Sequence, residues 1–531
     1  MSFISLRFAG FVIIALLVYY ALPKRWQWCV LLAASYYFYL CTGIKRVLFL
    51  LFTTITTWGF ALLIEKRLLL QKDYLKEHKD SLSKDERKAY KALEKKKQRW
   101  LLFLCLFLNF GILIFLKYAD FCIAYWNLFR LRAFGDMEFV PFLNLLLPLG
   151  ISFYTFQSMG YLIDIYYGRC SAERNIFRFA LYVSYFPQII QGPISRFKEL
   201  SAELYRGADF DPLKIRSGFM RILWGLFKKL VIADRLAGYV ENSIALRGTY
   251  QGVYLLLTIF FYSMQIYGDF SGGIDVALGV SEMFGIRVAE NFERPFFSKN
   301  IAEYWRRWHI TLGTWFKDYI FYPLTVSKSL LRFSKWVRTH ISEGLGKRIP
   351  LYLPMIAVWV ATGMWHGSES RFVVWGLLNC FFLILGTELE PVSLALTRRL
   401  KLTERSFGLK LFRVLRTFCL MAFLRVFDIS ESVPAAFQTI RDAFCFSGGF
   451  DWNIVFTELG LPEEELRVAV IALLVLLCVS LLQQKGSIRE RLSEKPAYLQ
   501  WIVLGVLFTG VVVFGTYGMG YDAKAFIYLQ F

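Results

Sequence analysis

The chain has 531 residues, and 56% of them are hydrophobic, against about 45–50% in a typical soluble domain. Many of these residues gather in runs that approach the roughly 20 residues a helix needs to cross a bilayer, which excludes an ordinary soluble protein. In a membrane protein, a formal net charge of +21 primarily indicates how the chain is oriented, because basic residues concentrate in cytoplasmic loops. No aromatic–basic motif or zinc-finger spacing accompanies it, so we expect no nucleic-acid partner.

The absence of common metal-binding and nucleotide-binding motifs narrows the possible functions of the chain. The nine cysteines are scattered, and none forms a Cys-x-x-Cys pair, so the pattern predicts neither a disulfide framework nor a metal site. The chain has no Walker lysine loop, no His-Glu-x-x-His and no Gly-x-Gly-x-x-Gly. We therefore expect no metal and no tightly bound cofactor.

The first apolar run, 4–22, is followed by Lys24 and Arg25. A cleaved signal peptide would carry its charges before the run, so this run predicts a retained transmembrane helix. In chain order the candidate membrane segments are 4–22, 27–44, 47–64, 100–118, 141–165, 178–192, 217–237, 252–284, 351–366, 371–388, 410–427, 464–483 and 497–516.

Two of these segments are irregular. The run 178–192 is short and contains Pro187, and the run 252–284 is long and interrupted by Gly268, Gly272 and Gly273. Such segments are often re-entrant or line a cavity, because unpaired backbone cannot face lipid. The sequence therefore predicts an all-α polytopic membrane protein with about eleven transmembrane helices plus re-entrant helices.

One hydrophilic segment, 65–99, separates the early apolar runs. It holds thirteen Lys and Arg residues against seven Asp and Glu residues, and no Pro. The positive-inside rule places it in the cytoplasm, and its composition predicts a helical loop. Such a loop is either simply solvated or binds anionic lipid or an acidic partner. A second basic stretch covers 326–349.

The sequence contains no internal repeat and no low-complexity linker. We therefore expect residues 1–531 to form a single membrane domain.

Histidine is the scarcest type that can do proton chemistry, with four in the chain. His78 and His340 lie in charged stretches, where solvation is the simplest interpretation. His309 lies in an aromatic stretch, and on a continuous helix it would share a face with Trp305 and Trp308. Arg306 would point elsewhere, toward the headgroups or an anionic ligand.

His366 follows Trp365 at the end of an apolar run and has Gly363 and Gly367 on either side. Glycines allow another backbone or a ligand to approach closely. A neutral imidazole in an apolar pocket can act as a base toward a hydroxyl. A hydrogen-bonded packing role is the alternative for both apolar histidines.

Acidic residues inside apolar segments are the remaining candidates, because burying a charge in a membrane is costly. They are Asp164, Asp269 and Asp275. The simplest interpretation is that they are packing residues or ion-pair partners of arginines.

Five motifs, distributed over nearly the whole chain, resemble those of the membrane-bound O-acyltransferase (MBOAT) superfamily. The resemblance is to the branch that contains the alginate O-acetylation membrane protein, which is related to the D-alanyl-lipoteichoic acid transferases. The motifs are Leu147–Gln157 (LPLGISFYTFQ), Phe186–Arg196 (FPQIIQGPISR), Tyr304–Phe316 (YWRRWHITLGTWF), Trp365–Gly367 (WHG) and Phe526–Phe531 (FIYLQF).

The resemblance implies a helical fold around a tunnel through the membrane, with His366 as the essential histidine and His309 as the second. We expect substrate contacts at Trp305, Arg306, Trp308, Trp365 and Asp269. The resemblance also implies a multi-pass protein of the bacterial cytoplasmic membrane, in contact with membrane lipid. Its donor would be a cytoplasmic acyl thioester, either acetyl-CoA or an acyl carrier protein.

The acceptor implied by the resemblance is a hydroxyl of a cell-envelope polysaccharide, reached directly or through an extracytoplasmic transferase partner, and acetyl is the expected acyl group. Two alternatives stay open. One is D-alanyl transfer to teichoic acid from a carrier protein, and the other is transport of an envelope polymer without acyl chemistry.

Overall fold

The structure is a computed structural model that describes residues 3–135, 139–403, 406–446 and 448–517. These residues are helical or irregular, and their only β-type pairing is one isolated bridge, between Phe292 and Trp308. Two compact units are present, residues 1–212 with 281–288 and residues 213–280 with 289–531. The single domain expected from the sequence stays a prediction.

Seven helical segments in the described residues are long and apolar enough to cross a membrane. They are Ile44–Glu77, Lys84–Phe134, Val253–Met283, Glu343–His366, Ser370–Glu388, Glu463–Lys485 and Ala497–Phe514. A shorter apolar helix covers Leu6–Ala21. The predicted all-α polytopic class is confirmed, and the figure of about eleven spans stays a prediction.

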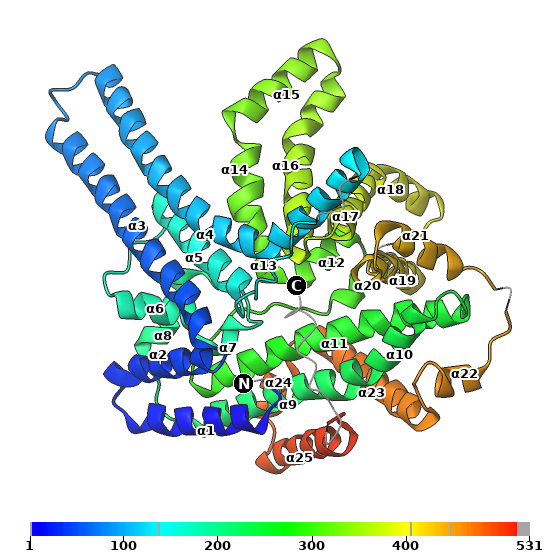
Figure 1. The fold of residues 1–531 in the computed structure, drawn as a ribbon. Coiled ribbons are helices and arrows are strands. Elements are labelled where there is room, and N and C mark those ends of the chain that lie inside the picture. The colour runs from blue at the N-terminus through cyan, green and yellow to red at the C-terminus, as the bar shows by residue number, and fades with distance from the viewer. Residues whose placement is uncertain (1–2, 136–138, 404–405, 447, 518–531) are drawn as a thin grey trace. The chain divides into compact units, whose positions relative to one another are not determined.

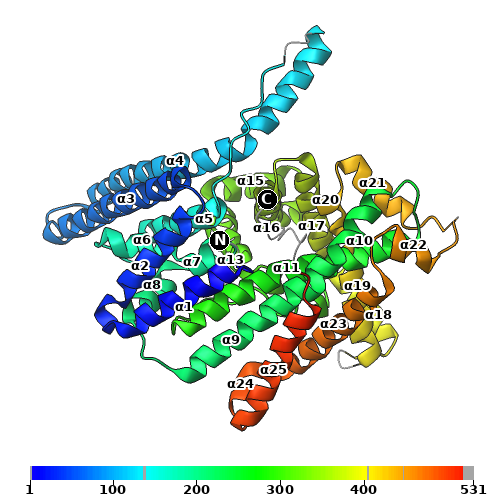
Figure 2. The same ribbon diagram turned by 60° about the horizontal axis from the view of Figure 1, so that its bottom comes forward.

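The first unit contains eight complete helices in its described residues. They are α1 (Leu6–Ala21), α2 (Lys24–Leu40), α3 (Ile44–Glu77), α4 (Lys84–Phe134), α5 (Ile151–Tyr166), α6 (Ile176–Ser184), α7 (Phe186–Ile189) and α8 (Phe197–Arg206). Helices α3 and α4 lie side by side as a long hairpin (Figures 1 and 2). Ser83 and Glu86 form a capping box that begins α4, so the basic stretch 65–99 is helical on both sides of a short turn.

The helices of the second unit follow in one list. They are α9 (Pro212–Leu226), η1 (Phe227–Ala233), α10 (Asp234–Ala245), α11 (Val253–Met283), η2 (Pro295–Phe297), α12 (Ile301–Arg307), α13 (Ile310–Phe316), η3 (Lys317–Phe321), α14 (Tyr322–Thr325), α15 (Lys328–His340), α16 (Glu343–His366), α17 (Ser370–Glu388), α18 (Glu390–Arg399), α19 (Phe407–Leu424), α20 (Val426–Ile429), α21 (Val433–Asp442), α22 (Trp452–Thr457), α23 (Glu463–Leu482), η4 (Gln483–Lys485), α24 (Ile488–Ser493) and α25 (Ala497–Phe514). Helix α16 packs against both α15 and α17 (Figure 1).

Helix α11 runs unbroken through the glycines that were expected to interrupt it, so that expectation is wrong. Its glycines instead allow close contact with α9 and η1. A Cβ on Gly272 would lie 2.7 Å from the carbonyl oxygen of Gly225, and one on Gly225 would lie 2.5 Å from that of Gly272. A Cβ on Gly268 would lie 2.7 Å from the carbonyl oxygen of Lys228. Small residues let helix backbones approach closely in this way.

The contact between Gly225 and Gly272 predicts a large effect of a single added methyl group. We expect Gly272→Ala to lower the free energy of unfolding by about 1–3 kcal/mol, because the new Cβ meets backbone atoms that cannot rotate away. Thermal unfolding of the purified protein in detergent measures this.

Gly505→Ala is the matched control, since a Cβ there meets nothing within 4 Å and the substitution is the same. It should leave the protein as stable as the wild type or slightly more so, because alanine reduces the freedom of the unfolded chain. Equal behaviour of the two variants would contradict the close approach.

Candidate active site

The two histidines of the apolar segments come together around one tryptophan in the second unit. The Trp365 ring centroid lies 5.6 Å from that of His309 and 5.0 Å from that of His366. Both imidazoles are buried, with exposed fractions of 3% and 6%. The other two histidines lie elsewhere: His340 is exposed at the end of α15, and His78 stacks on Tyr74 in the α3–α4 hairpin. The structure thus gathers the pair that the sequence singled out.

His366 is the last residue of α16, and glycines fix its position against α17. A Cβ on Gly363 would lie 2.4 Å from the carbonyl oxygen of Phe372, and one on Gly367 would lie 2.1 Å from the Phe372 ring. The approach that these glycines allow is therefore made by the backbone and ring of α17. This crossing brings Trp375 to the His366 ring, with centroids 4.6 Å apart.

His309 does not lie on a continuous helix, and the expectation that it shares a helix face with Trp305 and Trp308 is wrong. Helix α12 ends at Arg307, Trp308 is extended, and His309 has a φ of +48° before α13 begins. The cause is the antiparallel bridge between Trp308 and Phe292, which takes the Trp308 backbone out of the helix. His309 therefore projects from a junction between two short helices.

Asn291 holds His309 through its side-chain oxygen, Oδ1. This atom lies 3.2 Å from His309 Nδ1, 3.0 Å from the Thr311 backbone nitrogen and 2.9 Å from Thr311 Oγ1. The Thr311 N–H can only donate, so the amide oxygen must face this cluster. An oxygen acceptor requires the proton on His309 Nδ1, which leaves Nε2 as the basic nitrogen of the neutral ring.

A buried arginine supports the helix before His309. The Arg425 guanidinium lies 4.1 Å from the centre of the Trp308 ring, and it donates to the Tyr304 hydroxyl over 2.9 Å and to Asp428 over 3.3 Å. Tyr304 in turn stacks on Trp308, with centroids 5.7 Å apart and an interplanar angle of 11°. Trp308 is thus a packing element of this support as well as a predicted substrate contact.

The two arginines before Trp308 differ in their surroundings. Arg307 forms an ion pair with Glu303 over 2.7 Å, whereas Arg306 is exposed to solvent. Of the two, Arg306 is the side chain that is accessible to an anionic ligand.

Trp305 lies in a cluster of indoles that reaches His366. Its ring centroid is 4.9 Å from that of Trp359 and 5.7 Å from that of Trp375, which contacts His366. The Trp305 indole N–H is already donated to Asn379 Oδ1 over 3.2 Å. This N–H is thus engaged with protein.

The buried donors near the histidines include two that have no hydrogen-bond partner in the described part of the chain. They are Nε1 of Trp375, a residue that is 1% exposed, and Nδ2 of Asn291, which is fully buried. Buried polar groups are nearly always hydrogen-bonded, so each such donor calls for an explanation. A ligand oxygen would satisfy either one. Sequence reasoning missed both residues, together with Asn379, although Asn379 is a polar residue in an apolar run and that signal could have revealed it.

Asp269, a predicted substrate contact, faces a cation. Its Oδ1 accepts from Lys229 Nζ over 2.5 Å, and Lys229 also pairs with Asp234 over 2.8 Å. Asp275, one helical turn and a half further on, is bound by Lys228 and Arg221. In the first unit, Asp164 pairs with Arg169 over 3.1 Å. Asp164 and Asp275 thus pair with arginines, as the ion-pair interpretation states, whereas Asp269 pairs with a lysine.

No group of three or more His, Cys, Asp or Glu side chains that could hold a metal ion occurs in the residues described. The C-terminal motif Phe526–Phe531, which carried part of the family resemblance, lies outside the described residues.

Comparison with known proteins gives consistent matches. The family model described as MBOAT, membrane-bound O-acyltransferase family, matches residues 170–339, a range that includes His309 and ends before His366. A probable alginate O-acetylase of Pseudomonas syringae pv. tomato is 31% identical over 82% of this chain and 73% of its own length. A peptidoglycan O-acetyltransferase of Helicobacter pylori is 30% identical over 71% and 67%, and a teichoic acid D-alanyltransferase of Bacillus subtilis is 28% identical over 44% and 58%.

The burial of His309 predicts a pH dependence of stability. His309 lies outside the seven candidate spans, and burial lowers its pKa to about 3, from about 6.5 in an unfolded chain. Between these values the unfolded state binds the proton and the folded state does not. Stability is therefore full above pH 6.5 and falls as the pH drops, by about 2 kcal/mol between pH 7 and pH 5.

The variant His309→Asn should lack this part of the pH dependence, because asparagine does not titrate, tolerates a positive φ and keeps an amide donor for Asn291. Unfolding in detergent at pH 7 and pH 5 measures the difference. A parallel loss of stability in the wild type and the variant would contradict a neutral, buried His309.

Proposed function

This chain is a multi-pass membrane protein that belongs to the membrane-bound O-acyltransferase family, and we propose that it transfers an acetyl group from a cytoplasmic thioester to a hydroxyl of a cell-envelope polysaccharide. The family membership rests on the match over most of the chain to relatives named as O-acetylases. These relatives are named for alginate and for peptidoglycan, both of which are polymers of the envelope or outside it. The chain accordingly carries out O-acyl transfer, and the acetyl group and its polymer acceptor are our proposal.

The observation that carries the assignment to this site is the pair of buried imidazoles that both contact the Trp365 ring, beside buried N–H donors. Acyl transfer from a thioester to an alcohol needs a base for the hydroxyl and a donor for the carbonyl oxygen, which gains negative charge as the hydroxyl adds. Both kinds of group are present here, and they lie buried in an apolar, aromatic setting.

In the proposed mechanism, the imidazole of His366 takes the proton of the acceptor hydroxyl while the hydroxyl oxygen attacks the thioester carbonyl. The new C–O bond gives a tetrahedral intermediate with an oxyanion. The C–S bond then breaks, the carbonyl reforms, and the proton passes from His366 to the departing sulfur. The products are an ester and a free thiol, so protons and charge balance.

The N–H groups of Trp375 and Asn291 are the donors that we propose for the oxyanion, in preference to Trp305, whose indole N–H is engaged with Asn379. His309 is proposed to act through Nε2, the nitrogen that Asn291 leaves unprotonated. It would accept a hydrogen bond from the acceptor or hold the substrate next to His366. The predicted substrate contacts, Trp305, Arg306, Trp308, Trp365 and Asp269, stay proposals.

The donor is proposed to be acetyl-CoA or an acyl carrier protein, and the protein is proposed to lie in the bacterial cytoplasmic membrane. An extracytoplasmic transferase that receives the acetyl group is the proposed partner. D-alanyl transfer is the second candidate, favoured by the similarity to teichoic acid D-alanyltransferases. A D-alanyl carrier protein therefore belongs among the donors tested.

The histidine assignment predicts loss of turnover in His366→Ala. We expect thioester consumption to fall by about 10²–10⁴-fold, because a positioned general base contributes about that much. The assay uses purified protein in nanodiscs with acetyl-CoA, acetyl carrier protein and D-alanyl carrier protein, with and without envelope polysaccharide.

His340→Ala is the control, since that exposed histidine lies on α15 and contacts only its own helix through Nδ1. It should keep wild-type turnover. Full activity of His366→Ala would overturn the assignment, and polymer transport without any thioester turnover would favour the transporter alternative.

The unpartnered indole of Trp375 gives a sharper prediction. Trp375→Phe removes the N–H and keeps an aromatic ring, so we expect kcat to fall by about 100-fold, as for the loss of one oxyanion donor, with little change in KM. Steady-state kinetics with the best donor measures this.

Trp359→Phe is the matched control, because Trp359 belongs to the same indole cluster and its ring centroid lies 6.1 Å from that of Trp375. A purely structural role of the cluster would give the two variants the same kinetic defect, and that result would contradict the donor role of Trp375.

A further inference from the structure

The α3–α4 hairpin is the most strongly basic element of the chain that the proposed chemistry does not use. Helix α3 is free of charge from Val47 to Ile64, and α4 is free of charge from Trp100 to Leu116. The thirteen basic residues of 65–99 lie directly beyond these two apolar runs. Clusters of four to eight Lys and Arg residues beside a transmembrane helix are typical of sites for anionic lipids.

A groove on one flank of the hairpin is lined by cationic and neutral side chains. Its volume is about 690 Å³, and we call it the lysine groove; it is lined by Gln71, Lys72, Leu75, Lys76, Lys91, Ala92 and Lys95. No carboxylate lines it. Lys95 donates to the Tyr166 carbonyl over 3.3 Å, whereas Lys72, Lys76 and Lys91 form no ion pair with any described residue.

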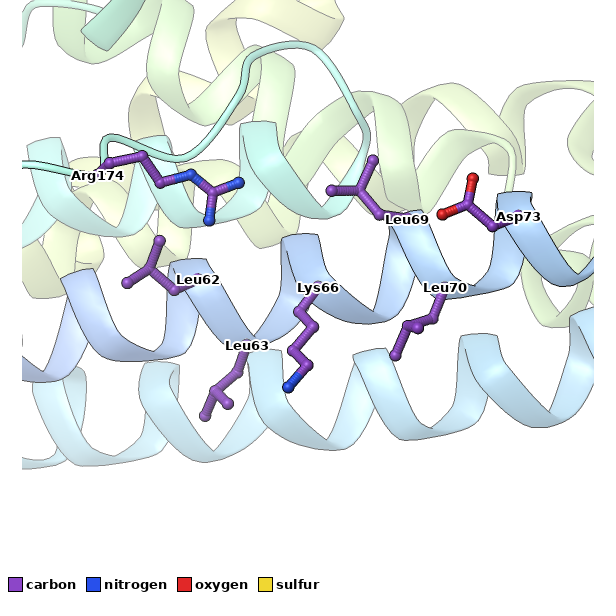
Figure 3. Close-up of a pocket in the computed structure, with 7 residues that line it drawn as sticks. All are labelled: Leu62, Leu63, Lys66, Leu69, Leu70, Asp73 and Arg174. Atoms are coloured by element: carbon purple, nitrogen blue, oxygen red, sulfur yellow. The ribbon is translucent and has the colours of Figure 1, made fainter.

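A second groove lies along another face of α3, where the apolar run ends. Its volume is about 280 Å³, and we call it the leucine groove; it is lined by Leu62, Leu63, Lys66, Leu69, Leu70, Asp73 and Arg174. In Figure 3, Lys66 and Leu63 project to one side of α3, and Leu62 and Leu69 project to the side of Arg174. Leu63 and Leu70 are half exposed, so the apolar surface of the span continues into the basic stretch.

The direction of α3 turns its lysines toward the bilayer. A Cα–Cβ bond in a helix tilts toward the helix N-terminus, and the N-terminal part of α3 is the apolar run. Lys72 lies about 12 Å beyond Ile64 along the helix axis, and its long side chain can reach back toward the headgroups. The α3 side of the lysine groove is therefore within reach of lipid phosphates at the membrane surface.

We propose that the lysine groove binds the headgroup of an anionic phospholipid, whose acyl chains remain in the bilayer beside the apolar runs of α3 and α4. The three lysines without ion pairs supply the charge. The exposed leucines at the base of the hairpin favour a lipid over an acidic protein, because a bilayer covers them and a soluble partner farther out does not.

The test compares two variants with the same change in charge. Lys72, Lys76 and Lys91 are replaced together by glutamine in the groove variant. Lys79, Lys84 and Lys88, which are exposed residues of the same hairpin outside the lysine groove, are replaced by glutamine in the control. The full-length protein is delipidated in neutral detergent and offered equal amounts of phosphatidylglycerol and phosphatidylcholine. Native mass spectrometry then counts the lipids retained.

We expect the wild type and the control to prefer phosphatidylglycerol, and the preference of the groove variant to fall at least about fivefold, the effect of one lysine at a charged surface. An equal loss in both variants would show a response to overall charge and overturn the groove. No preference in the wild type would also overturn it and leave an acidic protein as the occupant. Because lipid retention needs no acyl transfer, these outcomes do not depend on the proposed function.

Discussion

The side-chain oxygen of Asn291 is the acceptor on which the geometry around His309 depends. It accepts from His309 and twice from Thr311, so it ties the imidazole to the first turn of α13. The positive φ of His309 costs energy for a residue with a Cβ, and it persists only where neighbouring contacts fix it. The bridge of Phe292 with Trp308 fixes the chain on the other side of the histidine. One polar side chain thus sets the backbone, the tautomer and the direction of a buried base.

The fold class could be predicted from the sequence because apolar run length directly reflects bilayer thickness. The runs at 371–388 and 497–516 became α17 and α25 with nearly the same bounds. The interruption expected in 252–284 was wrong because glycine has two opposite effects in a membrane helix. It weakens the isolated helix, but it also allows close packing, and packing prevails where Gly272 meets Gly225. That choice depends on a partner segment far away in the sequence.

The candidate site could be predicted only in part for a similar reason. His309 and His366 stood out because histidine is scarce and rarely lies in apolar segments. Trp375 and Asn291 could not be identified, since one of fifteen tryptophans and one asparagine before an aromatic residue carry no local signal. These two residues stand out because their buried N–H donors have no hydrogen-bond partner among the described residues. Whether a donor finds a partner depends on its neighbours in three dimensions. The prediction that Trp308 shares a helix face with His309 was wrong for the same reason, because the bridge to Phe292 outweighs local helix propensity.

The buried charges of the second unit are paired with one another, and the aromatic neighbours of Trp365 and His366 are neutral rings, an arrangement that fits the proposed chemistry. Asp269 and Asp275 on α11 are neutralised by Lys229 and by Lys228 with Arg221, and removing one partner would leave an uncompensated charge. The surroundings of Trp365 instead contain imidazoles, indoles and an amide. A fixed carboxylate there would repel an oxyanion, and a fixed ammonium would lower the basicity of His366. A base that must take a proton from a hydroxyl works best beside neutral N–H dipoles, which interact mainly with the negative charge that develops on the oxyanion. The buried N–H groups of Trp375 and Asn291 are dipoles of this kind.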